Sequence, residues 1–569
     1  MRKVLAILII LAWPLSAWAG VTYYISNANP VGSDSNNGTS TSTPWLTIAQ
    51  VNSSTFSPGD SILFNSGCTW SGQLTVASSG ISGAPITIGS YGSGAKPIIN
   101  PSTVVSSWTL VSGSVYDSNI SALNLVNFVY MVCEDNIPLQ IATSDALSDG
   151  QWYYSYPTLY YKPSSGTPSS HVVTFIQDNT STSATTYNCG INLSNQSYIN
   201  ITGIELIDTF VGVITVETTA QSNNISVTYC SFLYNAYSGI QFFTLTGASN
   251  GNLSNNYFEY CAQGPTLETQ AVSNASTFNN FTMNYNTVVG VGAINGTTAW
   301  NTVTGKSNDE EGIGAQDLTN SFIEYNTITG GISNQGAIVL YNNNSGISSG
   351  NLTAFNLING VNGGGNGLLM WTGGTNSGYN GNQTVYNIII NSTGYPFSIG
   401  QGTAATVQNL FANNVIAGNN GDPILILSGT SIYLTFKNNI LFNNSGSQTY
   451  FTGVYNTDVP DATFICDYNL YPAAPTFGSS NTSKTWAQWQ ALGYDTHAVV
   501  GNPLFTNGSG AFDLATDFTL QPGSPAIHAG TVVGLTQDFA GNLISGVPDI
   551  GAFEFIQKLS PPTNLRVIQ

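Results

Sequence analysis

The sequence is poor in basic side chains. Nine Lys and Arg residues stand against 28 Asp and Glu residues, which gives a formal net charge of −19 at pH 7. Proteins that bind nucleic acid neutralise its phosphates with Lys and Arg, so this balance argues against a nucleic-acid partner. It equally argues against an anionic polymer held by basic side chains. A polyanion would need a bridging cation instead.

Histidine and closely spaced cysteine are also scarce. The only histidines, His171, His497 and His528, lie outside the main repeat described below, which speaks against a His-dependent triad or a His-built metal site on that repeat. The six cysteines lie far apart, without metal-like spacing. Two alternatives stay open for them: disulfides, for example between Cys230 and Cys261, and buried free thiols.

The one long apolar run lies at the start. Within Met1–Ala19, Arg2 and Lys3 precede the apolar run Val4–Leu11, and Ala17–Ala19 has the small-any-small form of a cleavage site. We interpret residues 1–19 as an export signal, which predicts a secreted or cell-surface protein. No later segment is apolar and long enough to predict a membrane span.

The sequence does contain a repeated phrase: apolar, any, apolar, any, any, Asn, any, apolar. It is clear in Phe281–Val288 and Phe322–Ile328. The Asn position is filled in turn by Gly203, Cys230, Asn256, Asn286, Asn326, Asn356, Asn387, Asn414, Asn439 and Asn469. Successive positions are 25 to 31 residues apart, except for one step of 40. A period of this size indicates a stacked array.

The composition of each repeat selects the kind of array. Apolar residues alternate over short spans rich in Val, Ile, Tyr, Phe and Thr, which is typical of strands. No long amphipathic helix separates them, so βαβ units are excluded. The sequence therefore predicts an all-β fold, a parallel β-helix whose coils stack at about 4.8 Å. Asn at one register in successive coils predicts an amide ladder along the axis, a structural role.

Segments at both ends carry a family resemblance. The N-terminal part resembles the start of secreted bacterial right-handed parallel β-helix proteins of the pectate-lyase-like superfamily, through Tyr23, Pro58–Asp60, Ile86–Gly92 and Lys96–Ile99. The C-terminal part looks like their cap, through Trp486–Phe505, Gly523–Ile527 and Pro548–Phe555. The resemblance implies a right-handed coil, and the superfamily includes polysaccharide lyases, glycoside hydrolases and proteins without known activity.

The same resemblance suggests the domain organisation. Asp149–Tyr154 and Leu159–Pro163 look like a small β insertion, and short helices within Thr43–Val51 and Thr485–Leu492 would plug the two ends. We expect a signal peptide (1–19), an N-terminal cap with first coils (20–115), the insertion (116–190), central coils (191–475), a C-terminal coil and cap (476–557) and a tail (558–569). Asp495, in the cap, is interpreted as structural.

A second strand in each coil, often opened by Gly, should present one face to solvent. By alternation, the second and fourth residues after Gly point outward. In the coil opened by Gly336 these are Ile338 and Leu340. Elsewhere the outward face mixes amides, aromatics and one carboxylate, namely Gln241, Phe243, Gln316, Trp371 and Glu268. Such a surface suits a sugar chain, and equally suits an ordinary solenoid exterior.

The one repeat interval of 40 residues contains a cluster of charged residues. Its extra residues lie between Asn286 and Gly312 and carry the densest charge in the coils, including Lys306, Asp309, Glu310 and Glu311, with Asp317 soon after. Long loops on a rigid scaffold are where functional sites concentrate. A solvated turn without function is the alternative.

Three chemistries fit this cluster. Glu268 paired with Asp309, Glu310, Glu311 or Asp317 predicts hydrolysis of a glycosidic bond, which needs no cofactor. Asp309, Glu310 and Glu311 binding Ca²⁺, with Lys306 as base, would make a uronate lyase. Ca²⁺ binding without catalysis is the third.

Comparison with known enzymes weighs against the lyase. Glu310–Ile313 is similar to the Asp-Asp-Gly-Trp-Asp segment of one calcium-dependent pectate lyase family and to the Asn-Thr-Asp-Gly-x-Asp segment of polygalacturonases, but Gly314 replaces the last Asp of both. The coils contain no Arg, which is frequent in the active sites of β-helix lyases. The sequence thus favours a secreted protein that hydrolyses extracellular polysaccharide, over a lyase and over a non-catalytic adhesion protein, with no oligomeric state assigned.

Overall fold

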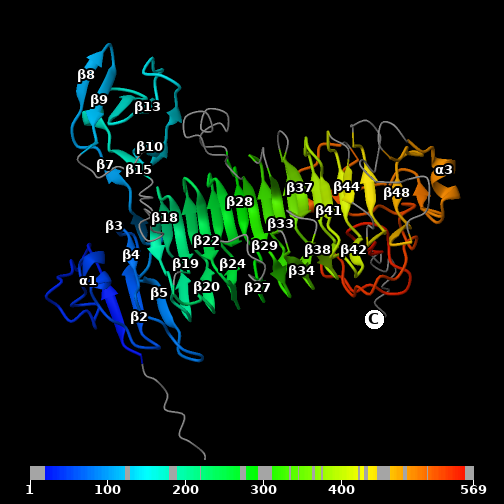
Figure 1. Cartoon of the computed structure of the whole chain (residues 1–569), viewed down its shortest axis with the longest axis horizontal. Helices are drawn as coiled ribbons and strands as arrows, with labels where there is room; N and C mark the ends of the chain where they lie inside the picture. The colour runs from blue at the N-terminus through cyan, green and yellow to red at the C-terminus, as the bar shows by residue number, and fades with distance from the viewer. Residues whose placement is uncertain are drawn as a thin grey trace, which may run out of the picture.

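The chain folds into a parallel β-helix, as the repeat predicted (Figure 1). The structure is a computed structural model. It describes residues 20–557, apart from 122–128, 178–188, 218, 270–276, 293–309, 332–334, 344, 362–364, 373–375, 421–422, 429–432, 445–461, 479–482 and 509. The predicted export signal, Lys306, Asp309 and the tail therefore lie outside the described residues. In the described part, no helix is long and apolar enough to cross a membrane.

One sheet, called here the site sheet, has ten parallel strands along the solenoid. They are β4 (Leu74–Thr75), β16 (Cys189–Asn192), β19 (Val211–Val216), β22 (Ser238–Thr244), β26 (Gln263–Thr269), β29 (Glu311–Gln316), β33 (Gly336–Asn342), β37 (Asn366–Thr372), β41 (Phe397–Gln401) and β44 (Ile424–Ser428). Each strand pairs with the strand of the next coil, so residues of equal register form rows that cross the sheet.

A sheet of thirteen strands forms another wall of the solenoid. It contains β3 (Thr69–Ser71), β6 (Ile98–Asn100), β18 (Glu205–Ile207), β21 (Ser231–Leu233), β25 (Tyr257–Glu259), β28 (Thr287–Val289), β32 (Thr327–Thr329), β36 (Leu357–Asn359), β40 (Ile388–Ile390), β43 (Val415–Ala417), β46 (Ile440–Phe442), β48 (Leu470–Tyr471) and β49 (Val499–Val500).

The remaining walls are shorter. One six-stranded sheet contains β1 (Thr22–Ile25), β2 (Ser61–Asn65), β5 (Ile86–Tyr91), β17 (Ile199–Thr202), β20 (Ile225–Thr228) and β24 (Asn252–Ser254). A second six-stranded sheet contains β31 (Phe322–Glu324), β35 (Leu352–Ala354), β39 (Gln383–Val385), β42 (Asn409–Ala412), β45 (Leu434–Lys437) and β47 (Phe464–Asp467). A five-stranded sheet contains β23 (Gly247–Ser249), β27 (Thr277–Asn279), β30 (Leu318–Thr319), β34 (Ile347–Ser349) and β38 (Gly378–Asn380).

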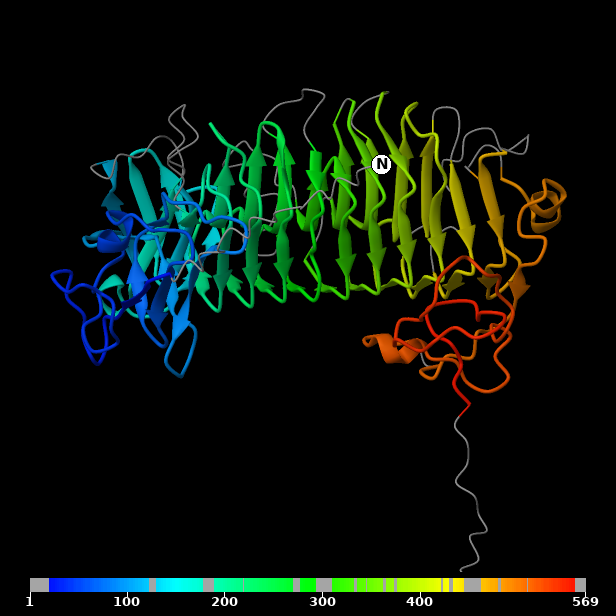
Figure 2. The ribbon, with the colours of Figure 1, turned by 90° about the horizontal axis from the view of Figure 1, so that it is seen from below.

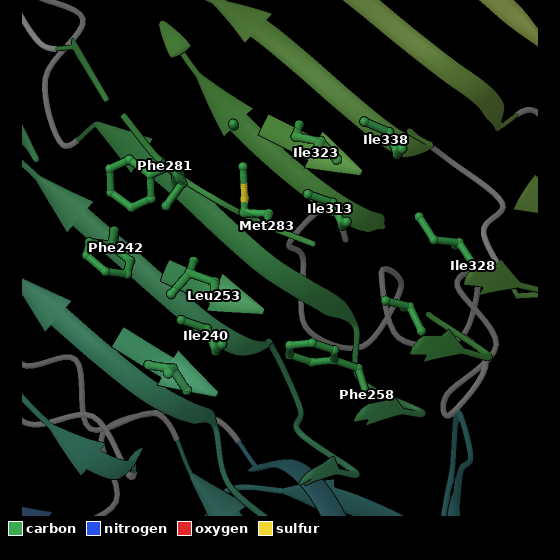
Figure 3. Packing of buried hydrophobic residues seen from close by; sticks show 14 of the residues in the cluster. Ile240, Phe242, Leu253, Phe258, Phe281, Met283, Ile313, Ile323, Ile328 and Ile338 are labelled. Atoms are coloured by element: carbon green, nitrogen blue, oxygen red, sulfur yellow. The ribbon is translucent and has the colours of Figure 1, made fainter. Parts of the chain in front are cut away.

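Glycine opens many strands of the site sheet because two sheets approach closely there. A Cβ on Gly239 would lie 2.4 Å from the Phe258 ring, and one on Gly212 would lie 2.5 Å from the Phe232 ring. Phe258 is fully buried beside Ile240 in the solenoid core (Figure 3). The glycines thus allow large apolar side chains from the thirteen-stranded sheet to fill the interior.

The predicted asparagine ladder is present and buried. Asn356 Nδ2 donates to Ile323 O and to Asn387 Oδ1, both at 2.9 Å, and its Oδ1 accepts from the backbone N–H of Asn326 at 2.9 Å. The same pattern links Asn256 through Asn469. These amides satisfy the backbone groups of each bend, so their role is structural, as predicted.

The residue before each ladder asparagine adopts a left-handed conformation. Tyr285, Tyr325 and Phe355 have φ of 58°, 57° and 58°. Such φ values are unusual for bulky side chains. Their rings stack on one another, with centroids 4.9 Å and 4.7 Å apart, which together with the ladder offsets the cost of the bend.

Short helices close both ends, as predicted. At the N-terminal end, α1 (Ile48–Asn52) buries Ile48 and Val51. At the C-terminal end, α3 (Trp486–Ala491) buries Trp489, whose Nε1 donates to Asp495 Oδ2 at 2.9 Å. Asn469 Nδ2 donates to the other oxygen of Asp495 at 2.9 Å. Asp495 therefore terminates the asparagine ladder, which confirms its structural interpretation.

The small β insertion stands at the N-terminal end of the solenoid (Figure 1). Its strands are β7 (Thr103–Val104), β8 (Thr109–Ser112), β9 (Val115–Asn119), β10 (Val129–Glu134), β11 (Ile137–Pro138), β12 (Gln140–Ile141), β13 (Gln151–Ser155), β14 (Thr158–Lys162) and β15 (Val173–Gln177). Because β7 pairs with β15, the insertion begins near residue 103 rather than at the expected residue 116.

The C-terminal segment folds back under the last coils. Its side chains, including Phe505, Phe518 and Phe553, form a second buried cluster with Ile388 and Val415, and Figure 2 shows this orange-to-red segment beneath the solenoid. All six cysteines of the chain are buried free thiols, which decides between the two alternatives left open by the sequence.

Candidate active site

In the coil that contains β33, the outward direction predicted for Ile338 and Leu340 is wrong. Ile338 pairs with Ile313, and both are buried in the core, as is Leu340. The glycine position of that coil is filled by Ala337, not Gly336, because Ala337 is the residue in register with Gly312. The outward side chains of β33 are therefore shifted by one residue, and Tyr341 is among them.

A cleft of about 350 Å³ lies on the outer face of β26, β29 and β33. Glu268 and Glu311 both line it, which places together two of the carboxylates that the sequence singled out. The other lining residues are Tyr237, Leu267, Ala315, Gln316, Gln335, Tyr341 and Asn343. Hydrolysis of a glycosidic bond requires two carboxyl groups, and this polar cleft contains both.

Glu311 reaches along its own strand to Gly314. A Cβ on Gly314 would lie only 1.6 Å from Glu311 Oε2, so the carboxylate occupies the space that a side chain at position 314 would fill. The same Cβ would lie 3.2 Å from Thr266 Cγ2, in the neighbouring strand. Gly314, which replaces the last Asp of the compared enzyme segments, therefore creates the niche for Glu311.

Glu268 reaches back toward the same row of the sheet. Gln241 Nε2 donates a hydrogen bond to Glu268 Oε2 at 3.1 Å, and Gln241, Thr266 and Gly314 are successive partners in register. Both carboxylates thus lie in one cleft, beside one row of the site sheet.

Gln316 is fixed at the floor of the cleft. Its Oε1 accepts from Thr269 N at 2.9 Å, Thr269 Oγ1 at 3.0 Å and Asn343 Nδ2 at 3.3 Å. Among the residues that the structure describes, its Nε2 has no hydrogen-bond partner. That amide nitrogen can donate a hydrogen bond to a ligand hydroxyl.

Asp317 does not line the cleft. It is 3% exposed, lies against Gly346, and accepts a hydrogen bond from Asn343 N at 3.1 Å. Burial raises the pKa of Asp317 to about 6, although the Asn343 hydrogen bonds oppose the shift. Since Asn343 does line the cleft, Asp317 positions a lining residue instead of facing a substrate.

Glu310 and Glu311 point to different places. Glu310 is fully buried, and a Cβ on Gly292 would lie 2.3 Å from its Cδ, whereas the Glu311 carboxylate lies over Gly314. Within the described ranges, no cluster of three His, Cys, Asp or Glu residues suited to a metal ion is found. Calcium binding through Asp309, which lies outside those ranges, stays a prediction.

The two predicted aromatic contacts lie on either side of the cleft. Phe243 is half-buried against an apolar cluster next to the insertion. Trp371 is 39% exposed and lines a separate hollow of about 200 Å³ with Asn366, Leu369, Tyr395, Ser398, Ile399 and Leu425. Gln241 is largely buried, so its part in the site is the contact with Glu268.

A larger hollow of about 640 Å³ lies in the C-terminal segment. Glu554 is the one titratable group in its lining, and burial together with the charge of Asp549 raises the pKa of Glu554 to about 7. A single carboxyl group lacks the partner that hydrolysis requires, so we place the candidate active site in the smaller, polar cleft.

Four lining residues with polar side chains were not predicted from the sequence: Tyr237, Gln335, Tyr341 and Asn343. The correct register at Ala337 would have found Tyr341, since it is the fourth residue after that position. Tyr237 and Gln335 directly precede strands and Asn343 directly follows one, where alternation gives no signal.

No protein-family model matches the chain. Over 87 residues, or 14% of the chain, it is 40% identical to a lacto-N-biosidase of Bifidobacterium longum subsp. longum, of whose length the match covers 5%. A solved structure described as XylC with xylose matches 95% of this chain and 99% of its own with a TM-score of 0.58 and 13% identity. The solved lacto-N-biosidase structure from Eubacterium ramulus matches 79% of this chain and 67% of its own, with a TM-score of 0.42 and 12% identity. The match to the XylC structure concerns the fold alone, and the chain has the parallel β-helix fold that the resemblance in its sequence implied.

Proposed function

We propose that this chain is an exported glycoside hydrolase that cleaves an extracellular polysaccharide or oligosaccharide, with Glu268 and Glu311 as its catalytic carboxyl groups. The observation that carries the proposal is their convergence beside one row of the site sheet, in one cleft. The local similarity to a lacto-N-biosidase, an enzyme named for sugar substrates, supports a glycan as the substrate class.

The reaction adds one water across the glycosidic C–O bond. One carboxyl group gives its proton to the leaving oxygen, and the other, ionised, activates water or attacks the anomeric carbon. The hydroxyl of water finally remains on the anomeric carbon, and its proton restores the carboxyl pair. Gln241 orients Glu268, and the niche over Gly314 orients Glu311.

The test incubates the protein with neutral and uronic glycans, with and without Ca²⁺. We expect new reducing ends without ultraviolet absorbance, and a loss of about 100- to 10,000-fold in Glu268→Gln and in Glu311→Gln. Glu324→Gln, outside the cleft, is the matched control and should keep its activity. Full activity in both cleft variants would refute the pair.

The other outcomes separate the alternative functions. Absorbance of an unsaturated product that disappears in chelator would establish the calcium-dependent lyase instead and direct attention to Lys306. Retention of a glycan without any product would establish a non-catalytic binding protein.

A further inference from the structure

The cleft is closed on the side that faces the N-terminal coils. Ile214 and Val216 point outward from β19, yet each is only 1% exposed. They belong to one buried cluster with Met131 and Ile176 of the β insertion. Side chains of the insertion therefore share an apolar core with the outer face of β19, so a groove cannot continue along the sheet past this strand.

An aromatic wall connects this covered region to the cleft. Tyr130 of the insertion packs on Phe210, with ring centroids 4.8 Å apart. Phe210 stacks on Tyr237, at 5.4 Å and an angle of 12° between the rings. Tyr237 in turn lines the cleft that holds Glu268. Phe243 packs against the same cluster, and its strand neighbours that of Glu268 in register.

On the opposite side, toward the C-terminal coils, a second hollow lies on the strands that follow the cleft. Tyr341 lines the cleft, and its partner in register on β37 is Trp371, which lines the second hollow. Adjacent strands lie about 4.8 Å apart, so the residues at the edges of the two hollows are neighbours on the sheet. Trp371 and Tyr395 offer apolar ring surface there, a suitable contact for the faces of sugar rings.

We infer that this site takes the end of a glycan chain and releases a product of one fixed length. The terminal part of the chain lies against Tyr237, the cleaved bond lies between Glu268 and Glu311, and the remaining chain extends over Trp371 toward Tyr395. This inference rests on the proposed function and adds the form of the substrate to it.

The test uses hexasaccharides of xylan, cellulose and polygalacturonate, each carrying a fluorescent label at its reducing end. We expect labelled products of a single length from the earliest time points on any substrate that is cleaved, and polymer viscosity that falls little as reducing ends appear. A mixture of lengths from the start would overturn this inference and leave the hydrolase intact. Absence of cleavage throughout a broad glycan panel would overturn the proposed function itself.

Variants test the wall directly. Tyr237→Ala should lower kcat/KM about tenfold and give mixed first products, because the aromatic stop is removed. Tyr237→Phe keeps the ring and should keep the single product, which guards against a loss through misfolding. Tyr156→Ala, an exposed ring in the β insertion, is the matched control and should keep both rate and product pattern. An unchanged rate and product pattern in Tyr237→Ala would overturn the inference.

Discussion

Gly314→Ala should inactivate the protein without unfolding it. The added methyl would lie 1.6 Å from Glu311 Oε2, whereas ordinary contacts are about 3.5 Å, so the carboxylate must move by roughly 2 Å. A misplacement of about 1 Å in an active site can cost about 100-fold in rate. We therefore expect kcat/KM to fall at least about 100-fold, or about 2.7 kcal/mol.

The assay pairs steady-state kinetics with thermal unfolding. Alanine is compatible with the backbone at position 314, which lacks a positive φ, so the free energy of unfolding should change by about 1 kcal/mol or less. Gly89→Ala, in a strand of another wall with its nearest atoms at 3.4 Å, is the matched control.

A double variant then identifies the cause of the loss. Gly314→Ala should cost little more in the Glu311→Gln background, since both changes remove the same group. Full activity in folded Gly314→Ala would refute the role of the niche.

Two further predictions concern stability. Asn356→Ala should lower the free energy of unfolding by about 3–5 kcal/mol in urea titrations, because it leaves buried backbone groups unpaired; exposed Asn280→Ala should cost far less, and equal losses would contradict the ladder. Burial raises the pKa of Asp208 to about 6 from its ordinary value of 3.8. The protonated carboxyl group therefore stabilises the fold fully below pH 3.8, and this contribution to the free energy of unfolding, about 3 kcal/mol, is lost as the pH rises through 6. Asp208→Asn should reduce the fall of the melting temperature between pH 4 and 7, and an unchanged slope would contradict this account.

The coils and their axial ladder were predictable because their signal is periodic. Asn356 and its equivalents recur at one register, and a buried amide that pairs with its own copies constrains every coil in the same way. The end plugs carried helical spacing of Ile48 and Val51 and of Trp486 and Trp489, so they too could be found in the sequence.

The site itself was only partly predictable. Alternation brought Glu268 and Gln316 to the outer face, but a one-residue shift between Gly336 and Ala337 hid Tyr341, because alanine fills a position that glycine fills in other coils. The niche of Glu311 exists because Gly314, three residues further along the strand, has no side chain. The spacing of apolar and polar residues in the sequence does not reveal such a niche. The wall on Tyr237 depends on a contact across about a hundred residues with the insertion, and that contact exists only in three dimensions.

The most direct test of the central claim is cleavage in water enriched in oxygen-18, followed by mass spectrometry of the products. Hydrolysis by the Glu268–Glu311 pair predicts one heavy oxygen at each newly formed reducing end, and no product from Glu268→Gln or Glu311→Gln within the same time. Products that carry no heavy oxygen and absorb in the ultraviolet would show elimination, and labelled products formed at full rate by both variants would place the chemistry elsewhere. Either result would contradict the account.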